Sequence, residues 1–271
     1  MVQNQIGICE WVFPAKGADV LYWAARLGYD GVQIAERGGF EAGDPLLNAA
    51  VQQTYYAAVQ DTGIQIQALH LWSLCRLACM IHPVGSDAGR VATKCIATAL
   101  AICRQMSIPK LMLTSGFLCQ IKNQKDLDIF SQHLGIACDL AEEAGTQIVF
   151  ESALAPAELN QVFQQTNERI KICYDLFNPI RFACGNPLEE IPQIGLHRID
   201  HIHAKDGPAN MVGCSLLGTG VGRYHEIMAL LRQLGYDGWL VSENYYAAPP
   251  ISDQMTFDAA AKRDLLTMRR S

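Results

Sequence analysis

The chain has 271 residues, which matches one (β/α)₈ barrel of roughly 250 residues or two small domains. Half of the residues (50%) are hydrophobic and 18% are charged, which excludes wholesale disorder and allows a large buried core. The 21 basic and 27 acidic side chains give a net charge of −6, which argues against a surface that neutralises nucleic-acid phosphates.

The ten cysteines contain no CxxC pair and no spacing typical of a structural zinc site. The first residues, MVQNQIGICEWVF, lack the basic and long apolar segments of a signal peptide. No uninterrupted apolar run is long enough to span a membrane. We therefore expect a cytoplasmic protein that binds neither membranes nor nucleic acid, with cysteines that mostly behave as small buried hydrophobic residues.

Short runs rich in Ile, Val and Leu alternate with amphipathic stretches along the whole chain, as in repeated β/α units. Apolar residues recur at three- and four-residue steps in the expected helices 20–27, 88–106 and 127–144. The similar sequences LGYDGVQI and LGYDGWLV each predict a helix that ends at a glycine before a strand. We expect eight strands, at residues 6–9, 31–35, 64–69, 110–114, 147–151, 170–175, 201–203 and 238–243.

No linker or low-complexity tract divides the chain, so we predict one domain over residues 1–271. Eight parallel strands with intervening helices favour an α/β fold that closes into a single (β/α)₈ TIM barrel. An open doubly wound sheet is the alternative, but no GxGxxG or GxxxxGK[ST] motif follows the first strand.

The last four expected strands all end in a polar side chain, and chemistry in a barrel gathers at the C-terminal ends of its strands. These residues are Glu151, Asp175, His203 and Glu243, each after an apolar run. Three carboxylates brought together without a counter-charge would repel one another, and a divalent cation resolves this conflict. The alternative is that each acid caps a helix or pairs with a nearby Lys or Arg.

Three carboxylates and one imidazole suit Mn²⁺ as the preferred ion, with Mg²⁺, Co²⁺ and Zn²⁺ as alternatives. The sequences IVFES, CYDLFN, HIHAKD and GYDGWLVSEN resemble the metal-ligand strands of the xylose-isomerase-like TIM barrel superfamily, which includes the sugar phosphate isomerase/epimerase family. The resemblance implies a metal held by Glu151, Asp175, His203 and Glu243, with His201 as a packed or hydrogen-bonded support residue.

The resemblance also implies an enzyme that isomerises or epimerises a sugar, a sugar phosphate or a related hydroxyketone through a metal-stabilised cis-enediolate. Glu151 and Glu243 would then also be catalytic, one taking a proton and the other returning it. A proton returned to the same carbon inverts that carbon, whereas return to the neighbouring carbon isomerises the sugar.

Three further residues are predicted to bind substrate by the same resemblance: His70, Asn178 and Lys205. His70 has a structural alternative, packing against Trp72. Asn178 stands where the sugar epimerases of the superfamily carry a histidine, so its role would be to orient the substrate rather than to change charge. Those epimerases also carry an arginine and a glutamate where this chain has Ala209 and Ala157, which argues against a free ketohexose as substrate.

Two loops add separate hypotheses. The apolar segment LWSLCRLACMIHPVG after the third strand suits a lid or a subunit contact, so the chain is a candidate homo-oligomer. The glycine-rich GCSLLGTGVGRYHEI suits anion binding through backbone amides, or serves only as a connection.

Alternative functions remain open at this point. An inosose or dehydroshikimate-type dehydratase would use the same metal site, with loss of a β-hydroxyl group. A non-catalytic barrel that binds a sugar or a metal is the other alternative. The AP-endonuclease type of the superfamily is disfavoured by the net charge of −6 and by a total of seven histidines.

Overall fold

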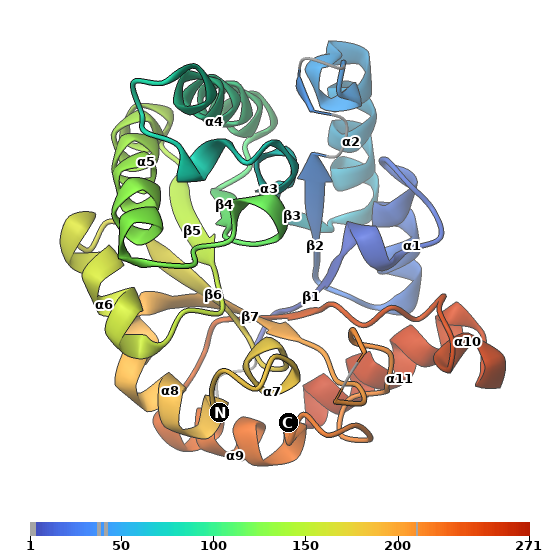
Figure 1. Cartoon of the computed structure of the whole chain (residues 1–271). Helices are drawn as coiled ribbons and strands as arrows, with labels where there is room; N and C mark the ends of the chain where they lie inside the picture. The colour runs from blue at the N-terminus through green and yellow to red at the C-terminus, as the bar shows by residue number, and fades with distance from the viewer. Residues whose placement is uncertain (1–3, 37–38, 41–42, 210) are drawn as a thin grey trace. The chain divides into compact units, whose positions relative to one another are not determined.

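The strands of the chain close into a parallel barrel. The computed structural model describes residues 4–36, 39–40, 43–209 and 211–271. The strands are β1 (Ile6–Cys9), β2 (Gly31–Glu36), β3 (Gln65–Leu71), β4 (Lys110–Thr114), β5 (Gln147–Glu151), β6 (Lys171–Asp175), β7 (Ile199–Ala204) and β8 (Trp239–Ser242). They follow one another in chain order around a closed barrel (Figure 1). The predicted (β/α)₈ fold is confirmed.

Helices follow the strands. The α-helices are α1 (Asp19–Leu27), α2 (Ala49–Thr62), α3 (Ser73–Leu77), α4 (Asp87–Met106), α5 (Gln124–Ala144), α6 (Pro156–Gln165), α7 (Asn178–Arg181), α8 (Pro187–Ile194), α9 (Tyr224–Leu234), α10 (Ile251–Gln254) and α11 (Phe257–Arg270). Short 3₁₀ turns are η1 (Glu10–Val12), η3 (Pro45–Leu47), η4 (Cys79–Ile81), η5 (Phe117–Cys119) and η6 (Leu196–Arg198). The three helices expected from periodicity correspond to α1, α4 and α5.

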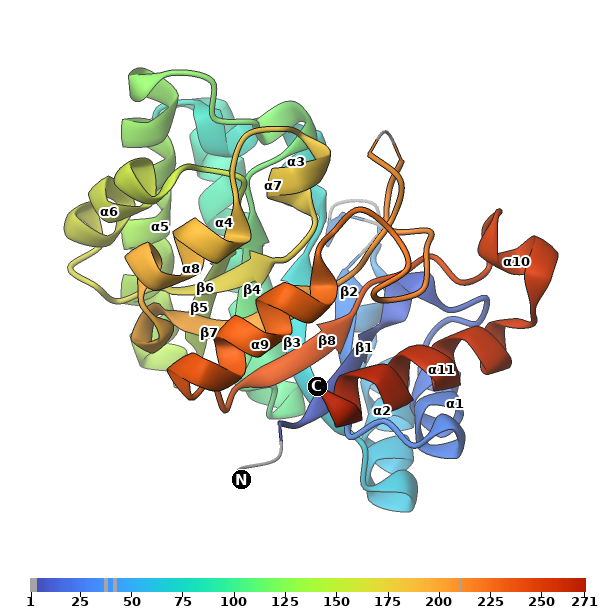
Figure 2. The same cartoon turned by 90° about the horizontal axis from the view of Figure 1, so that it is seen from below.

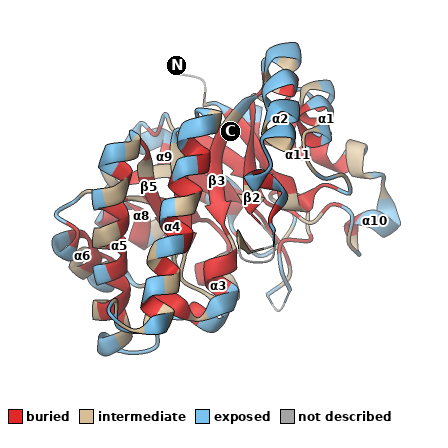
Figure 3. Cartoon of the chain, turned by 90° about the horizontal axis from the view of Figure 1, so that it is seen from above, coloured by how far each residue is buried: buried red, intermediate tan, exposed pale blue. Residues whose placement is uncertain are grey.

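The burial of the strands and helices explains the apolar patterns by which the sequence predicts them. All residues of β1 and β8 are buried, because a parallel strand of this fold is covered on both faces and therefore reads as a continuous apolar run. In α4, Ala92, Ile96, Ala99 and Cys103 recur at three- and four-residue steps and are buried. Figure 3 shows the buried and exposed faces of this helix.

Tertiary contacts divide the chain into two compact units. The first unit comprises Met1–Gln33, Ala57–Ile66 and Cys173–Ser271. In it, β1 pairs in parallel with β2 and β8, and β7 pairs in parallel with β8. Helix α11 contacts β1, β8 and α1, and α8 lies beside α9 (Figure 2).

The second unit comprises Ile34–Tyr56 and Gln67–Ile172. In it, β4 pairs in parallel with β3 and β5. Helices α4 and α5 lie side by side and contact β4 and β5, respectively (Figure 1). The single domain over residues 1–271 stays a prediction.

The repeated LGYDG sequence ends two helices as expected. Gly28 closes α1 with φ +97° and Gly235 closes α9 with φ +80°, a left-handed conformation that favours glycine. The N–H group of Gly28 donates to the carbonyl of Ala24, 3.0 Å away, which satisfies one of the last carbonyls of the helix.

The cysteines also behave as predicted. All ten are free thiols and nine are buried, with Cys184 exposed. In the part of the chain that the structure describes, no helix has the length and apolar character needed to cross a bilayer.

Candidate active site and metal centre

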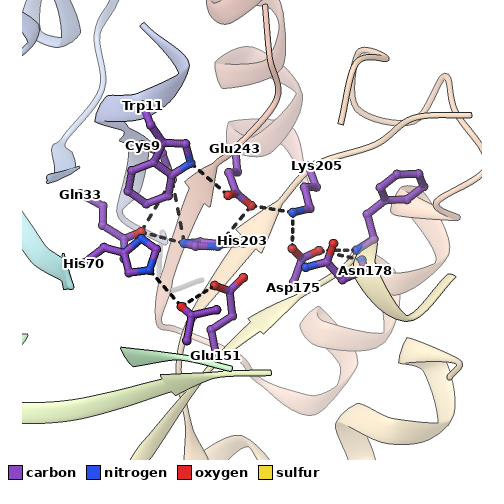
Figure 4. Close-up of polar contacts among 12 residues, drawn as sticks. Cys9, Trp11, Gln33, His70, Glu151, Asp175, Asn178, His203, Lys205 and Glu243 are labelled. Atoms are coloured by element: carbon purple, nitrogen blue, oxygen red, sulfur yellow. Dashed lines mark hydrogen bonds and ion pairs between the residues drawn. The ribbon is translucent and has the colours of Figure 1, made fainter. Parts of the chain in front are cut away.

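The ends of β6, β7 and β8 bring together three of the predicted metal ligands within the first unit. Asp175, His203 and Glu243 each offer one ligand atom, and these atoms lie within 4.8 Å of one another. All three side chains are buried. Figure 4 shows them pointing toward a common point beside Lys205. They form a group that can hold a metal ion.

One oxygen of each carboxylate is fixed by the protein itself. Oδ1 of Asp175 accepts hydrogen bonds from the backbone N–H groups of Phe177 (2.8 Å) and Asn178 (2.9 Å), where α7 begins. Oε1 of Glu243 accepts a hydrogen bond from Nε1 of Trp11 at 3.0 Å. The remaining oxygens, Oδ2 of Asp175 and Oε2 of Glu243, therefore face the interior of the group.

The imidazole of His203 is held in a defined orientation. Its Nε2 lies 2.7 Å from Oε1 of Gln33, and its Nδ1 lies 3.4 Å from Oε2 of Glu243. Because an amide oxygen only accepts, Nε2 carries a proton and Nδ1 faces the carboxylates. This is the arrangement that a metal-ligating histidine requires, with a second-layer acceptor behind the ring. Sequence reasoning missed Gln33, although a lone amide inside the apolar run GVQIA marked it.

Lys205 lies between the carboxylates of Asp175 and Glu243. Its Nζ lies 2.5 Å from Oδ2 of Asp175 and 2.7 Å from Oε2 of Glu243, and the residue is only 7% exposed. The ammonium group supplies a counter-charge to both carboxylates, so the alternative that the acids pair with a nearby Lys holds for Asp175 and Glu243 in this structure. Lys205 was predicted to bind substrate; it lies two residues after His203, and residues two apart along a strand share one face.

Burial and charge act in opposite directions on the ionisable groups. Burial raises the pKa of Glu243, but the adjacent Lys205 and His203 outweigh burial and hold that pKa well below its ordinary value. For His203, burial lowers the pKa of the imidazole, while Cys173, Cys9 and Glu243 raise it, and the raising effects prevail. Glu243 is therefore a carboxylate at neutral pH.

The second unit holds Glu151 and His70 on one hydrogen-bonded chain. Oε2 of Glu151, at the end of β5, accepts a hydrogen bond from Oγ1 of Thr114 at 3.1 Å. The same hydroxyl lies 3.0 Å from Nε2 of His70. The His70 ring also packs edge-on against Trp72, so the structural contact considered for it exists alongside the polar one. Thr114 orients Glu151, a role that the sequence did not reveal.

Of the other predicted residues, Asn178 begins α7 and its backbone supports Asp175, as described above; a role for its side chain stays a prediction. His201 is fully buried and its Nδ1 lies 2.8 Å from Oδ2 of Asp200, which agrees with a support residue. Cys173, His201 and His203 form a second buried group with ligand atoms within 4.8 Å of one another.

Three glycine amides of the glycine-rich loop bind a side chain of the chain itself. The carboxylate of Asp206 accepts hydrogen bonds from the N–H groups of Gly207, Gly218, Gly220 and Gly222, at 2.8 to 3.0 Å. Asp206 is completely buried. The three loop amides, those of Gly218, Gly220 and Gly222, are therefore occupied by an internal carboxylate, and binding of another anion by this loop stays a prediction.

The apolar segment after β3 folds as α3 and η4 and leads into α4. Leu77 of α3 is exposed, as are Phe117 and Leu118 of η5, which contacts α3. A lid or a subunit contact at this segment stays a prediction.

Comparisons with known proteins agree with the fold. The 2-epi-5-epi-valiolone 7-phosphate 2-epimerase of Actinoplanes sp. is 24% identical over 230 residues, which cover 84% of this chain and 82% of that protein. The D-psicose 3-epimerase of Clostridium cellulolyticum is 17% identical, with a TM-score of 0.78 and 98% of both chains covered. The structure of the IolI protein with a zinc atom is 15% identical, with a TM-score of 0.76 and 98% of both chains covered.

The similarity to the Actinoplanes epimerase supports the prediction of an enzyme that acts on sugars. The family model described as "Xylose isomerase-like TIM barrel" matches residues 21–267. The chain belongs to the xylose isomerase-like TIM barrel family.

Proposed function

We propose that this protein is a divalent-metal-dependent epimerase or isomerase of a sugar, a sugar phosphate or a related hydroxyketone. The observation that carries the proposal is the buried convergence of Asp175, His203 and Glu243 at strand ends of this barrel. Its similarity to an epimerase named for a sugar-like phosphate supports the substrate class.

The residues present fit a divalent ion. Asp175 and Glu243 turn one oxygen each toward a point already taken by the ammonium of Lys205, a stand-in for a cation. We propose that Glu151, which ends the strand before β6 in the barrel order, is the fourth ligand. Three carboxylates and an imidazole favour Mn²⁺, with Mg²⁺, Co²⁺ and Zn²⁺ as alternatives, and the related IolI protein binds zinc.

When bound, the ion would polarise the substrate carbonyl and acidify the adjacent C–H bond. One of the carboxylates, Glu151 or Glu243, accepts the proton from that carbon, and the C–H electron pair moves toward the carbonyl oxygen to give an enediolate. The other glutamate, once it has taken up a proton from solvent, returns that proton to the enediolate. Trp11 orients Glu243 and Thr114 orients Glu151, so that each carboxylate presents a fixed oxygen.

Deuterium incorporation tests this chemistry. The protein is loaded with Mn²⁺ and offered ketoses, inososes and ketose phosphates in D₂O, and we expect deuterium at the carbon next to the carbonyl. Glu151→Gln should abolish the exchange with the fold retained, whereas the exposed Glu143→Gln should not affect it. Absence of exchange with every substrate, in protein shown to hold metal, would contradict the proposal.

The products separate the alternatives. An inverted centre or an aldose–ketose pair supports the proposed reaction. Net loss of water would replace it by a dehydratase. Ligand binding without exchange would replace it by a non-catalytic barrel.

A reducing compartment such as the cytoplasm is the proposed location. The ten free cysteines, nine of them buried, support it, because unpaired thiols in such number are typical of reducing compartments.

A further inference from the structure

Lys205 holds the two oxygens that a metal ion would need. Asp175 has its Oδ1 tied to two backbone N–H groups, and Glu243 has its Oε1 tied to Trp11. Nζ of Lys205 contacts the other oxygen of each, at 2.5 and 2.7 Å (Figure 4). An ammonium and a divalent ion on the same two oxygens would repel each other, because both are cations.

On the basis of the proposed function, we propose that Lys205 exchanges partners: the metal ion displaces its ammonium from Asp175 and Glu243, and the released ammonium binds an anionic group of the substrate. The substrate class is therefore a phosphorylated or otherwise anionic sugar. The metal and this anion bind cooperatively. The metal releases the ammonium that the anion needs, and the anion pairs with the ammonium that would otherwise compete with the metal for the carboxylates.

The free-energy cost of an unpaired buried charge is the reason why the released ammonium needs a new anionic partner. Lys205 is 7% exposed, and an ammonium that has lost both carboxylates without a new partner is strongly unfavourable at such a place. A phosphate oxygen restores the lost interaction, and lysine binds phosphate as a compact point charge.

The protein backbone packs closely against the aliphatic part of the Lys205 side chain. A Cβ atom on Gly213 would lie 2.8 Å from Cβ and 3.2 Å from Cδ of Lys205. The loop backbone thus packs closely along the aliphatic part of the Lys205 side chain, while its ammonium end contacts the two carboxylates that a metal would claim. The exchange is therefore a movement of the ammonium end of this side chain.

Binding measurements test the exchange without relying on turnover. The Mn²⁺ affinity is measured by calorimetry with and without inorganic phosphate, for the wild type, for Lys205→Met and for the exposed control Lys125→Met. In the wild type and in the control, phosphate should tighten Mn²⁺ binding by about 5–150-fold, the usual range for coupled sites, and Mn²⁺ should tighten phosphate binding by the same factor. Mn²⁺ and phosphate also associate with each other in solution. The Lys205→Met variant, which lacks the ammonium, shows how much this association alone changes the apparent Mn²⁺ affinity.

Lys205→Met should bind Mn²⁺ alone more tightly than the wild type, because the competing ammonium is gone, and phosphate should no longer affect it. If the Met variant does not fold, as judged by circular dichroism, Lys205→Gln replaces it with the same expectations. Weaker Mn²⁺ binding in the variant, or unchanged coupling, would overturn the exchange.

The outcome for the proposed function is read separately. Deuterium exchange with neutral ketoses in a wild type that shows no phosphate coupling would overturn the exchange at Lys205 and leave the epimerase proposal intact. Failure of the wild type to bind any divalent ion would overturn both.

Discussion

Substitution of Asp206 tests how much its hydrogen bonds to the glycine-rich loop of the first unit stabilise the protein. One carboxylate accepts four backbone hydrogen bonds: Oδ1 from Gly207 and Gly222, and Oδ2 from Gly218 and Gly220. The substitution Asp206→Asn preserves the shape of the side chain but replaces one oxygen by an NH₂ group. Two of the four N–H groups then face a donor instead of an acceptor.

The magnitude follows from those two N–H groups. A buried donor left without an acceptor costs about 1–3 kcal/mol, so the free energy of unfolding should fall by about 2–6 kcal/mol in Asp206→Asn. Urea denaturation followed by circular dichroism measures this loss. The exposed Asp237→Asn is the matched control and should change the free energy of unfolding by less than about 0.5 kcal/mol.

Hydrogen exchange localises the effect. One pair of amides, either Gly218 and Gly220 or Gly207 and Gly222, should lose its acceptor in Asp206→Asn and should lose more protection than the amides of α4 in the second unit. A loss below about 1 kcal/mol would refute the reasoning, because the four bonds could then not be the support of the loop. Unchanged protection of all four glycine amides would refute it equally.

Three further predictions concern residues around the site. Gln33→Leu should weaken Mn²⁺ binding by about 10–100-fold, since His203 loses the acceptor that fixes its ring, and calorimetry with the folded variant checks this. Gly220→Ala should destabilise the protein in urea, because the added Cβ would lie 2.3 Å from Oδ1 of Asp206 and 2.6 Å from the backbone N of Gly207; unchanged stability would contradict this. Burial raises the pKa of Asp264 to about 6 from 3.8, so the folded state binds the proton more tightly than the unfolded state. The protonated Asp264 therefore adds to the free energy of unfolding below pH 4, and this addition of about 3 kcal/mol is lost as the pH rises through 6. A pH series of urea denaturations should show this decrease for the wild type and not for Asp264→Asn.

The strands were predictable because the physics that buries them is local. A parallel strand covered on both faces reads as an apolar run, and β1, β4 and β5 have the bounds that the sequence predicts. The polar residue after each run marked the strand end. For the same reason Glu151, Asp175, His203 and Glu243 were nominated together, and the structure gathers the last three within one unit.

The partners of these residues depend on segments far apart in the chain. Gln33 reaches His203 across 170 residues, and Trp11 reaches Glu243 across 232. The Asp206 carboxylate binds amides 12 to 16 residues later only because the loop turns back on itself. Periodicity within a segment carries no information on such pairings.

Charge gives the reason why Lys205 does not make the metal ion superfluous. As a metal ligand His203 has to be neutral and would release its extra proton when the ion binds. The carboxylates of Asp175 and Glu243 and the ammonium of Lys205 then leave one net negative charge in this group. Glu151, as the proposed fourth ligand, raises this to two, which one divalent ion cancels. If an anionic substrate then enters, the ammonium released from the carboxylates is the positive group that can bind it. The lysine between the carboxylates thus keeps the charge of the site low before the ion arrives and serves as the anion's partner afterwards.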